Sequence, residues 1–214
     1  MKIFLDTADV EAIKKANDTG MLNGVTTNPS KVLASGRKFT DVVKEIARIV
    51  DGPVSAEAVA YTAPEIVTEA QKIASIAPNI NVKVPMTIEG LKAGIELANL
   101  GIKTNVTMVF SPDQALLAMK AKAFLVSIVI SRLDKIGGDV TAFIEDTMAI
   151  KKNYGFESQI LAASIKTRKD VIDCMRVGVD IITIPEDIFF MMYKHPLTDQ
   201  GLAEFDVAWE KVIK

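Results

Sequence analysis

Cysteine and histidine are nearly absent: the chain has one of each among its 214 residues. A lone cysteine, Cys174, excludes an intramolecular disulfide and fits a reducing compartment. Together with the single His195 it cannot form the soft ligand set of a zinc site. A carboxylate-based magnesium site stays open in principle, but the sequence shows no clustered acidic loop that would form one. We therefore expect no metal ion and no cofactor.

An excess of positive charge is also absent. Lys and Arg number 25 against 27 Asp and Glu, for a formal net charge of −2. No broad cationic field can hold nucleic acid or an anionic membrane, so we expect neither as a partner. Long apolar runs are missing as well. At the start of the chain, Asp6 interrupts the apolar residues before the core of a signal peptide could form. We expect a cytoplasmic protein.

Short β-branched runs alternate with longer amphipathic segments along the chain. In segment 39–50, for example, Val42, Ile46 and Val50 recur at helical spacing. The predicted strands are 3–5, 24–26, 53–56, 81–84, 102–106, 124–129, 159–162 and 180–184. The predicted helices are 39–50, 63–76, 88–100, 112–121, 140–153 and 169–177. Gly101 and Gly178 precede strands, where a left-handed helix cap is expected.

Eight strands that alternate with helices predict a single domain, residues 1–214, folded as a closed (β/α)8 barrel of the TIM type. Strands buried on both faces should be apolar throughout, and most of these runs are. Residues 198–213, with the only tryptophan, are predicted to form an additional C-terminal helix that caps the barrel or packs on a neighbouring subunit. A doubly wound open sheet is the alternative, but no Gly-x-Gly-x-x-Gly turn follows the first strand.

Polar residues recur where the predicted strands end. In a barrel these positions share one face, which is where barrel enzymes have their active sites. The repeated placement therefore predicts a functional site at that face. The residues in question are Asp6, Thr26, Thr27, Asn28, Glu57, Lys83, Asn105, Thr107, Ser127, Ser164 and Lys166.

Lys83 is the candidate nucleophile, because it lies between two valines on a predicted central strand. An isolated lysine more often packs its stem on apolar surface and extends its amine to water. Burial on such a strand disfavours the charged amine, and Schiff-base chemistry needs the neutral form. Asp6 and Glu57 are the candidate proton carriers, although Asp6 could instead cap a helix and Glu57 could be a solvated charge. Arg132 and Lys166 are candidates for binding an anionic group.

These residues occur in strings that resemble the small transaldolases and fructose-6-phosphate aldolases, a family of class I Schiff-base aldolases. The resemblance covers essentially the whole chain. Its motifs are Ile3-Phe4-Leu5-Asp6-Thr7-Ala8, Gly24-Val25-Thr26-Thr27-Asn28-Pro29-Ser30, Val82-Lys83-Val84-Pro85-Met86-Thr87, Gly101-Ile102-Lys103-Thr104-Asn105-Val106-Thr107, Leu161-Ala162-Ala163-Ser164 and His195-Pro196-Leu197-Thr198-Asp199.

The resemblance implies a cytoplasmic enzyme of the pentose phosphate pathway that needs no cofactor and acts on sugar phosphates. Lys83 would form an imine with the ketose, Asp6 would move protons, and Glu57 with Thr107 would hold the catalytic water. The dihydroxyacetone end would lie against Thr26, Asn28, Asn105 and Ser164, and the phosphate end near Ser127, Arg132 and Lys166. A homo-oligomer of five or ten subunits, which exchange their C-terminal helices, is also implied.

The sequence leaves the branch of the family open. A transaldolase transfers the dihydroxyacetone unit to an aldose phosphate, and Glu57 with the Asn105 and Thr107 pair resembles that branch. A fructose-6-phosphate aldolase releases free dihydroxyacetone and glyceraldehyde 3-phosphate, and the string that begins at Ser164 resembles that one. Ile128 and Val129 depart from both branches, which usually have proline followed by an aromatic residue. A non-catalytic sugar-phosphate-binding barrel is a third alternative, but Lys83, Asp6 and Glu57 are all retained.

Overall fold

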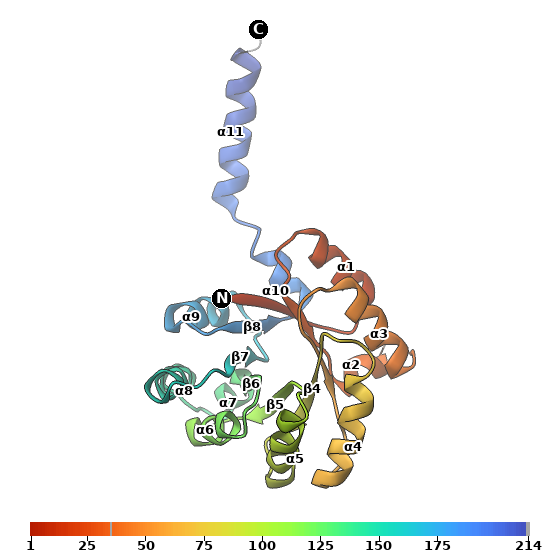
Figure 1. Ribbon diagram of the computed structural model, residues 1–214. Helices are drawn as coiled ribbons and strands as arrows, with labels where there is room; N and C mark the ends of the chain where they lie inside the picture. Colours follow the sequence, from red (N-terminus) through yellow and green to blue (C-terminus); the bar gives the residue numbers. More distant parts are fainter. Residues whose placement is uncertain (35, 213–214) are drawn as a thin grey trace.

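A closed barrel of parallel strands forms the centre of the molecule in a computed structural model that describes residues 1–34 and 36–212 (Figure 1). Each strand pairs with the next along the chain, and β1 pairs with β8 to close the ring. The predicted (β/α)8 fold is confirmed. The strands are β1 (Lys2–Asp6), β2 (Gly24–Thr26), β3 (Val54–Glu57), β4 (Ile80–Pro85), β5 (Thr104–Val109), β6 (Leu125–Val129), β7 (Gln159–Ala163) and β8 (Ile181–Ile184).

Helices other than the last surround the barrel (Figure 1), and they pack on it through their apolar sides. In α3, Val42, Val43 and Ile46 are buried on that side. In α1, the Asp9 side chain accepts hydrogen bonds from the backbone amides of Glu11 and Ala12 and so caps the helix. The helices are α1 (Val10–Asp18), α2 (Pro29–Ala34), α3 (Phe39–Ile49), α4 (Ala63–Ala74), α5 (Ile88–Asn99), α6 (Pro112–Lys120), α7 (Ile130–Asp134), α8 (Val140–Tyr154), α9 (Arg168–Val177), α10 (Glu186–Met191) and α11 (Pro196–Val212).

The start of β5 differs from the prediction, which placed it at Ile102. Gly101 adopts a left-handed conformation, with a φ of 76°, and the Ile102 amide donates a hydrogen bond to the Leu97 carbonyl at 2.9 Å. Ile102 therefore belongs to the cap of α5, and the strand begins at Thr104. Helices α1, α2, α7 and α10 were not specified from the sequence.

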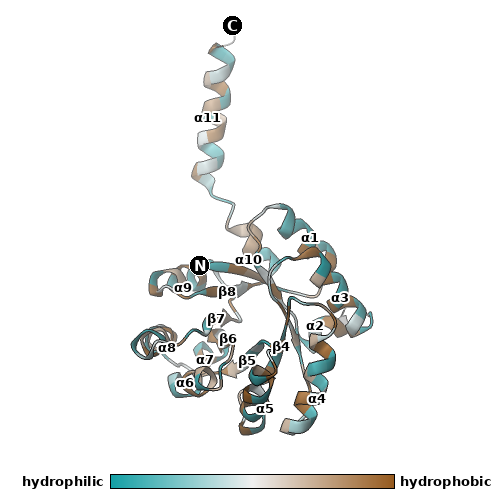
Figure 2. Cartoon of the chain, in the orientation of Figure 1, coloured by the Kyte–Doolittle hydropathy of each residue, from teal (hydrophilic) through white to brown (hydrophobic). Residues whose placement is uncertain are grey.

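Apolar side chains fill two regions of the fold. The larger core lies between the barrel and its helices, and residues such as Val82, Val106 and Ile128 are buried in it. A smaller cluster of Phe4, Leu125, Leu161 and Ile181 is also fully buried. In β6, Leu125 and Val126 belong to different clusters, which agrees with the alternation of side chains along a strand. The helices around the barrel contain both hydrophobic and hydrophilic residues, as expected for helices with one buried side (Figure 2).

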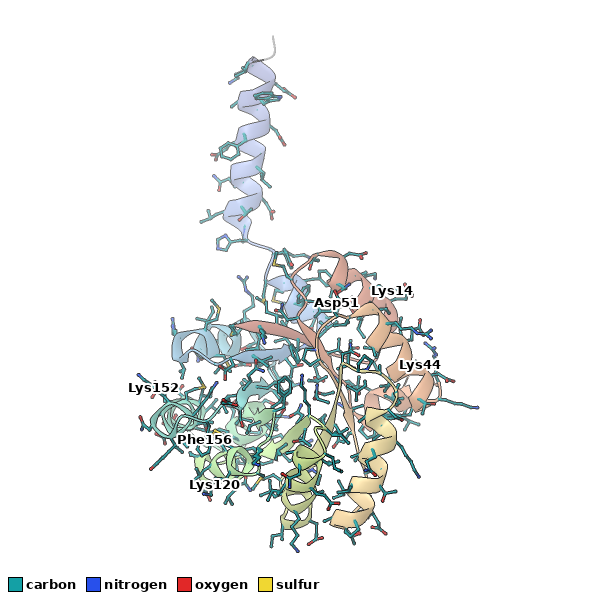
Figure 3. The ribbon with its side chains drawn as sticks, in the orientation of Figure 1. Lys14, Lys44, Asp51, Lys120, Lys152 and Phe156 are labelled. Carbon is teal, nitrogen blue, oxygen red and sulfur yellow. The ribbon has the colours of Figure 1, made fainter. Side chains whose placement is uncertain are left out.

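Helix α11 projects away from the barrel and has no buried residue (Figure 1). Its side chains extend outward on every side, whereas those of the barrel helices meet neighbouring elements (Figure 3). The helix was predicted at 198–213; it begins at Pro196, and residue 213 lies outside the described residues. His195 stabilises the first turn of α11, since its Nδ1 accepts a hydrogen bond from the Leu197 amide. Within the described residues, no helix combines the length and apolar character needed to cross a membrane.

Candidate active site

A pocket of about 460 Å³ opens at the carboxyl ends of the strands. This volume suits a small ligand, because small-molecule sites typically span about 300–1,000 Å³. The lining residues are Asp6, Thr26, Asn28, Pro29, Ser30, Lys31, Glu57, Lys83, Thr107, Met108, Ser127, Val129, Arg132, Leu161, Ala163, Ser164 and Thr183.

Lys83 lies on β4, directly opposite Glu57 on the neighbouring strand β3. Its amine is 3.0 Å from Glu57 Oε2 and donates a second hydrogen bond to the Thr27 carbonyl at 3.3 Å. The Lys83 side chain is 12% exposed and that of Glu57 is 24% exposed. A largely enclosed amine in contact with a carboxylate can exchange its proton without the help of bulk water. An adjacent base is one of the arrangements that can activate an amine as a nucleophile.

Buried polar side chains form a chain across four strands next to Lys83. Ser55 Oγ donates to Asn81 Oδ1 at 2.5 Å, and Asn105 Nδ2 donates to Ser55 Oγ at 3.0 Å. Ser127 Oγ then donates to Asn105 Oδ1 at 2.6 Å. Each of these side chains is fixed by its neighbours, so the barrel around Lys83 is rigid and polar.

The Asp6 carboxylate is held on both of its oxygens. Thr26 Oγ1 donates to Asp6 Oδ1 at 3.1 Å, and the Lys31 amine lies 2.9 Å from Asp6 Oδ2. The Thr26 hydroxyl is also 2.7 Å from Thr183 Oγ1 on β8. Since Thr26 donates its single hydroxyl proton to Asp6, Thr183 must donate to Thr26. Asp6 therefore accepts hydrogen bonds and does not cap α1, which Asp9 does.

Two pocket residues have backbone conformations that are unfavourable for residues other than glycine. Met108 has a φ of 65° and Ser164 a φ of 64°. Met108 lies where the pairing of β5 with β6 shifts register, between Val106 and Val109. Such irregularities re-aim side chains and concentrate at functional sites.

Arg132 lies at the mouth of the pocket, on the short helix α7. One guanidinium nitrogen is 3.8 Å from the Met108 sulfur. Among the described residues no ion pair includes Arg132. Its charge is available to an anionic group of a ligand, for which the planar guanidinium offers bidentate hydrogen bonds.

The structure brings nine of the predicted site residues to the pocket wall, and three lie elsewhere. Thr27 is buried, and its hydroxyl donates to the Ser55 carbonyl. Asn105 is fully buried in the polar chain described above, so it supports the wall from beneath. Lys166 does not line the pocket; its backbone amide bonds the Asp170 carboxylate just before α9. Ile128 packs in the core between barrel and helices, so of the two unusual neighbours only Val129 reaches the pocket.

Two pocket residues that bond to Asp6 or Thr26 were missed from the sequence, Lys31 and Thr183. Thr183 interrupts the apolar run of β8, and that single polar residue was a signal that could have identified it. Lys31 follows the Asn28-Pro29-Ser30 string, but a lysine usually extends its amine to water, so nothing local distinguished it. In the described part of the chain, no group of three or more His, Cys, Asp or Glu is placed to hold a metal ion.

The family profile described as Transaldolase/Fructose-6-phosphate aldolase matches residues 3–214 of the chain. A protein of Moorella thermoacetica named probable transaldolase is 55% identical over 212 residues, which is 99% of either chain. A probable transaldolase of Geobacter sulfurreducens is 50% identical over 214 residues, which is 100% of either chain. A third, from Clostridium tetani, is 51% identical over 205 residues, or 96% of either chain.

Among solved structures, the chain resembles a Coccidioides immitis protein described provisionally as a fructose-1,6-biphosphate aldolase. The TM-score is 0.61, with 12% sequence identity over 86% of this chain and 76% of the other. At this identity the similarity concerns the barrel fold alone.

Proposed function

The chain belongs to the transaldolase/fructose-6-phosphate aldolase family, and from this premise we propose that it cleaves a ketose phosphate through a Schiff base on Lys83. The dihydroxyacetone unit then passes to an aldose phosphate, in exchanges between sedoheptulose 7-phosphate and fructose 6-phosphate. One observation carries the proposal: an enclosed Lys83 amine 3.0 Å from the Glu57 carboxylate, in a pocket that also contains Asp6.

Imine formation begins with a proton transfer inside the ion pair. Lys83 gives a proton to Glu57, and the neutral amine adds to the ketose carbonyl to form a carbinolamine. Protonation of the carbinolamine hydroxyl releases water and leaves an iminium ion on Lys83. Glu57 supplies this proton directly or through one water, which it holds together with Thr107.

Carbon–carbon cleavage needs a base at the hydroxyl of the sugar's fourth carbon. Asp6 takes this proton, a carbonyl forms at the fourth carbon, and the electrons of the C3–C4 bond move to the iminium nitrogen. An aldose phosphate leaves, and a neutral enamine stays on Lys83. Addition of the enamine to a second aldose reverses these steps, and Asp6 returns the proton to the acceptor oxygen.

The remaining pocket residues are proposed to bind the two ends of the substrate. Thr26, Asn28 and Ser164 line the pocket and offer hydrogen bonds to the dihydroxyacetone end, with Asn105 beneath them. Ser127 and Arg132 lie toward the phosphate end, where Arg132 provides the charge. Lys166 would reach a phosphate only if its side chain turned toward the pocket mouth.

A fructose-6-phosphate aldolase is the second candidate. It shares imine formation and cleavage, but a proton rather than an aldose phosphate resolves the enamine. Val129 is the observation that favours it: this pocket-lining side chain is smaller than the aromatic residue that both branches usually have there, so it leaves more of the pocket to water.

Cleavage of fructose 6-phosphate with and without added erythrose 4-phosphate separates the two candidates. We expect turnover to depend on the acceptor, with sedoheptulose 7-phosphate as a product. Release of dihydroxyacetone at the full rate without an acceptor would contradict the transferase and support the aldolase. Lys83→Ala is the control for catalysis by a contaminating enzyme, because it should abolish both reactions.

We also propose that the enzyme acts as a homo-oligomer of five or ten subunits in which α11 packs on a neighbouring subunit. The proposal is supported by Leu202, Phe205 and Trp209, which are exposed and recur at three- and four-residue spacing on one face of α11. An exposed apolar face of this kind is typical of an interface. None of the residues of α11 is buried within the subunit, so no part of the described chain covers this face.

A further inference from the structure

The pocket contains two carboxylates, and each is paired with a lysine of its own. Glu57 contacts Lys83 at 3.0 Å, and Asp6 contacts Lys31 at 2.9 Å. In the proposed reaction Lys83 must lose its charge before it can attack the ketose. Lys31 has no such requirement, so its ammonium can stay beside Asp6 throughout the cycle.

Lys31 and Thr26 together define the plane of the Asp6 carboxylate. Each carboxylate oxygen receives one donor, Lys31 on Oδ2 and Thr26 on Oδ1, and the donors come from different elements, α2 and β2. The Lys31 amine also donates to the backbone carbonyl of Asp6, so it is attached to this residue at two points. Side chains of Lys31 and Asp6 are only 30% and 25% exposed, which limits the screening of the pair by water.

We infer that Lys31 is a positioning residue that holds the Asp6 carboxylate in the orientation of the base of the cleavage step, while Glu57 exchanges its proton with Lys83. The inference rests on the proposed function. Because the two carboxylates have different partners, they are suited to different tasks.

Lys31→Met tests the inference, since methionine is also unbranched and only one atom shorter, and it removes the charge. Borohydride trapping of fructose 6-phosphate on Lys83 should proceed as in the unaltered enzyme, because Glu57 and Lys83 are untouched. We expect the kcat for cleavage to fall about 10- to 100-fold, a part of the 10²–10⁴ that general base catalysis contributes. KM should stay within about twofold, because the lost contact acts on Asp6 rather than on the substrate.

The Asp6→Asn background shows whether Lys31 acts through Asp6. We expect the double variant to be no slower than Asp6→Asn alone, whereas independent effects would multiply. Lys31→Arg should restore most of kcat, because it returns a positive charge to Asp6. Lys92→Met is the matched control: it removes a lysine 2.7 Å from a carboxylate, Glu89, on the outer helix α5, and should change neither constant.

Three results would overturn the inference. An unchanged kcat in Lys31→Met would show that Asp6 does not need the ammonium. A raised KM for fructose 6-phosphate, with dihydroxyacetone trapping unaffected, would show that Lys31 binds the phosphate instead. Absence of an adduct on Lys83 in the unaltered enzyme would contradict the proposed function, and the inference with it.

Discussion

Lys83 and Glu57 form an ion pair whose burial is costly. Enclosed charges lose hydration, and their mutual attraction often does no more than offset that loss. The pair at 3.0 Å therefore contributes little to folding, and an apolar pair would serve the barrel as well. Its presence at the ends of two adjacent strands is better explained by the proton transfer that the proposed imine formation needs.

The buried thiol of Cys174 should make the stability of the protein depend on pH. Burial raises the pKa of its thiol from 9.0 to about 12, and the nearby Asp170 and Asp173 carboxylates add to the effect. Above about pH 9 the unfolded chain loses this proton and the folded chain keeps it, so the free energy of unfolding should decrease up to about pH 12. In Cys174→Ala, the decrease measured by urea unfolding should be shallower.

The same burial should make the thiol unreactive toward a disulfide reagent at about pH 8 until the chain is unfolded. Rapid modification of the native protein would contradict the buried placement of Cys174. Equal slopes of stability against pH in the two proteins would contradict the raised pKa.

Sequence reasoning found the site residues that stand at strand ends and missed those that only the closed barrel brings near. Asp6, Glu57 and Lys83 each follow or lie within an apolar run, so their position predicted the pocket. Thr26 and Thr183 are hydrogen-bonded although 157 residues separate them, and no local pattern encodes that contact. Nothing in the sequence singled out Lys31, whose contact with Asp6 depends on the packing of α2 beside β1.

Among the secondary-structure elements, strands were easier to predict than short helices. Runs of β-branched residues bounded by polar ones located all eight described strands, with errors at their ends. Ile102 was predicted to begin a strand because it is β-branched, but its amide caps the preceding helix instead. Helices such as α2 and α7 have six and five residues, too few for a periodic pattern to be recognised.

Two glycines in helices should respond oppositely to the same substitution. Gly178 ends α9 with a φ of 86°, and an added Cβ would meet no atom within 4 Å. Gly178→Ala should lower the free energy of unfolding by about 1 kcal/mol, because the left-handed conformation disfavours any Cβ. Gly94, inside α5, also has open space around a Cβ, so Gly94→Ala should raise it by about 0.5–1 kcal/mol.

Urea unfolding of both variants measures these changes. A destabilised Gly94→Ala would mean that the space beside α5 is filled in solution. An unchanged Gly178→Ala would contradict the left-handed cap of α9.

For the whole molecule, the barrel is complete without α11, whose apolar face is proposed to need a second subunit. Replacing both Phe205 and Trp209, which are 71% and 63% exposed, by lysine should leave the circular dichroism of the barrel intact. The mass measured by light scattering should fall toward that of the monomer, because two buried charges at an interface are unfavourable.

Glu204→Lys on the opposite side of the same helix is the matched control, because it replaces a negative by a positive charge at an exposed polar position away from the apolar face. It should keep the mass of the unaltered protein. If the unaltered protein has the mass of a monomer, the proposed assembly is contradicted.

Borohydride trapping with fructose 6-phosphate tests the central claim most directly. Intact mass and peptide mapping should reveal one reduced adduct on Lys83, absent from Lys83→Ala. The absence of any adduct with fructose 6-phosphate, sedoheptulose 7-phosphate or dihydroxyacetone, or an adduct that maps to Lys31 instead, would contradict it.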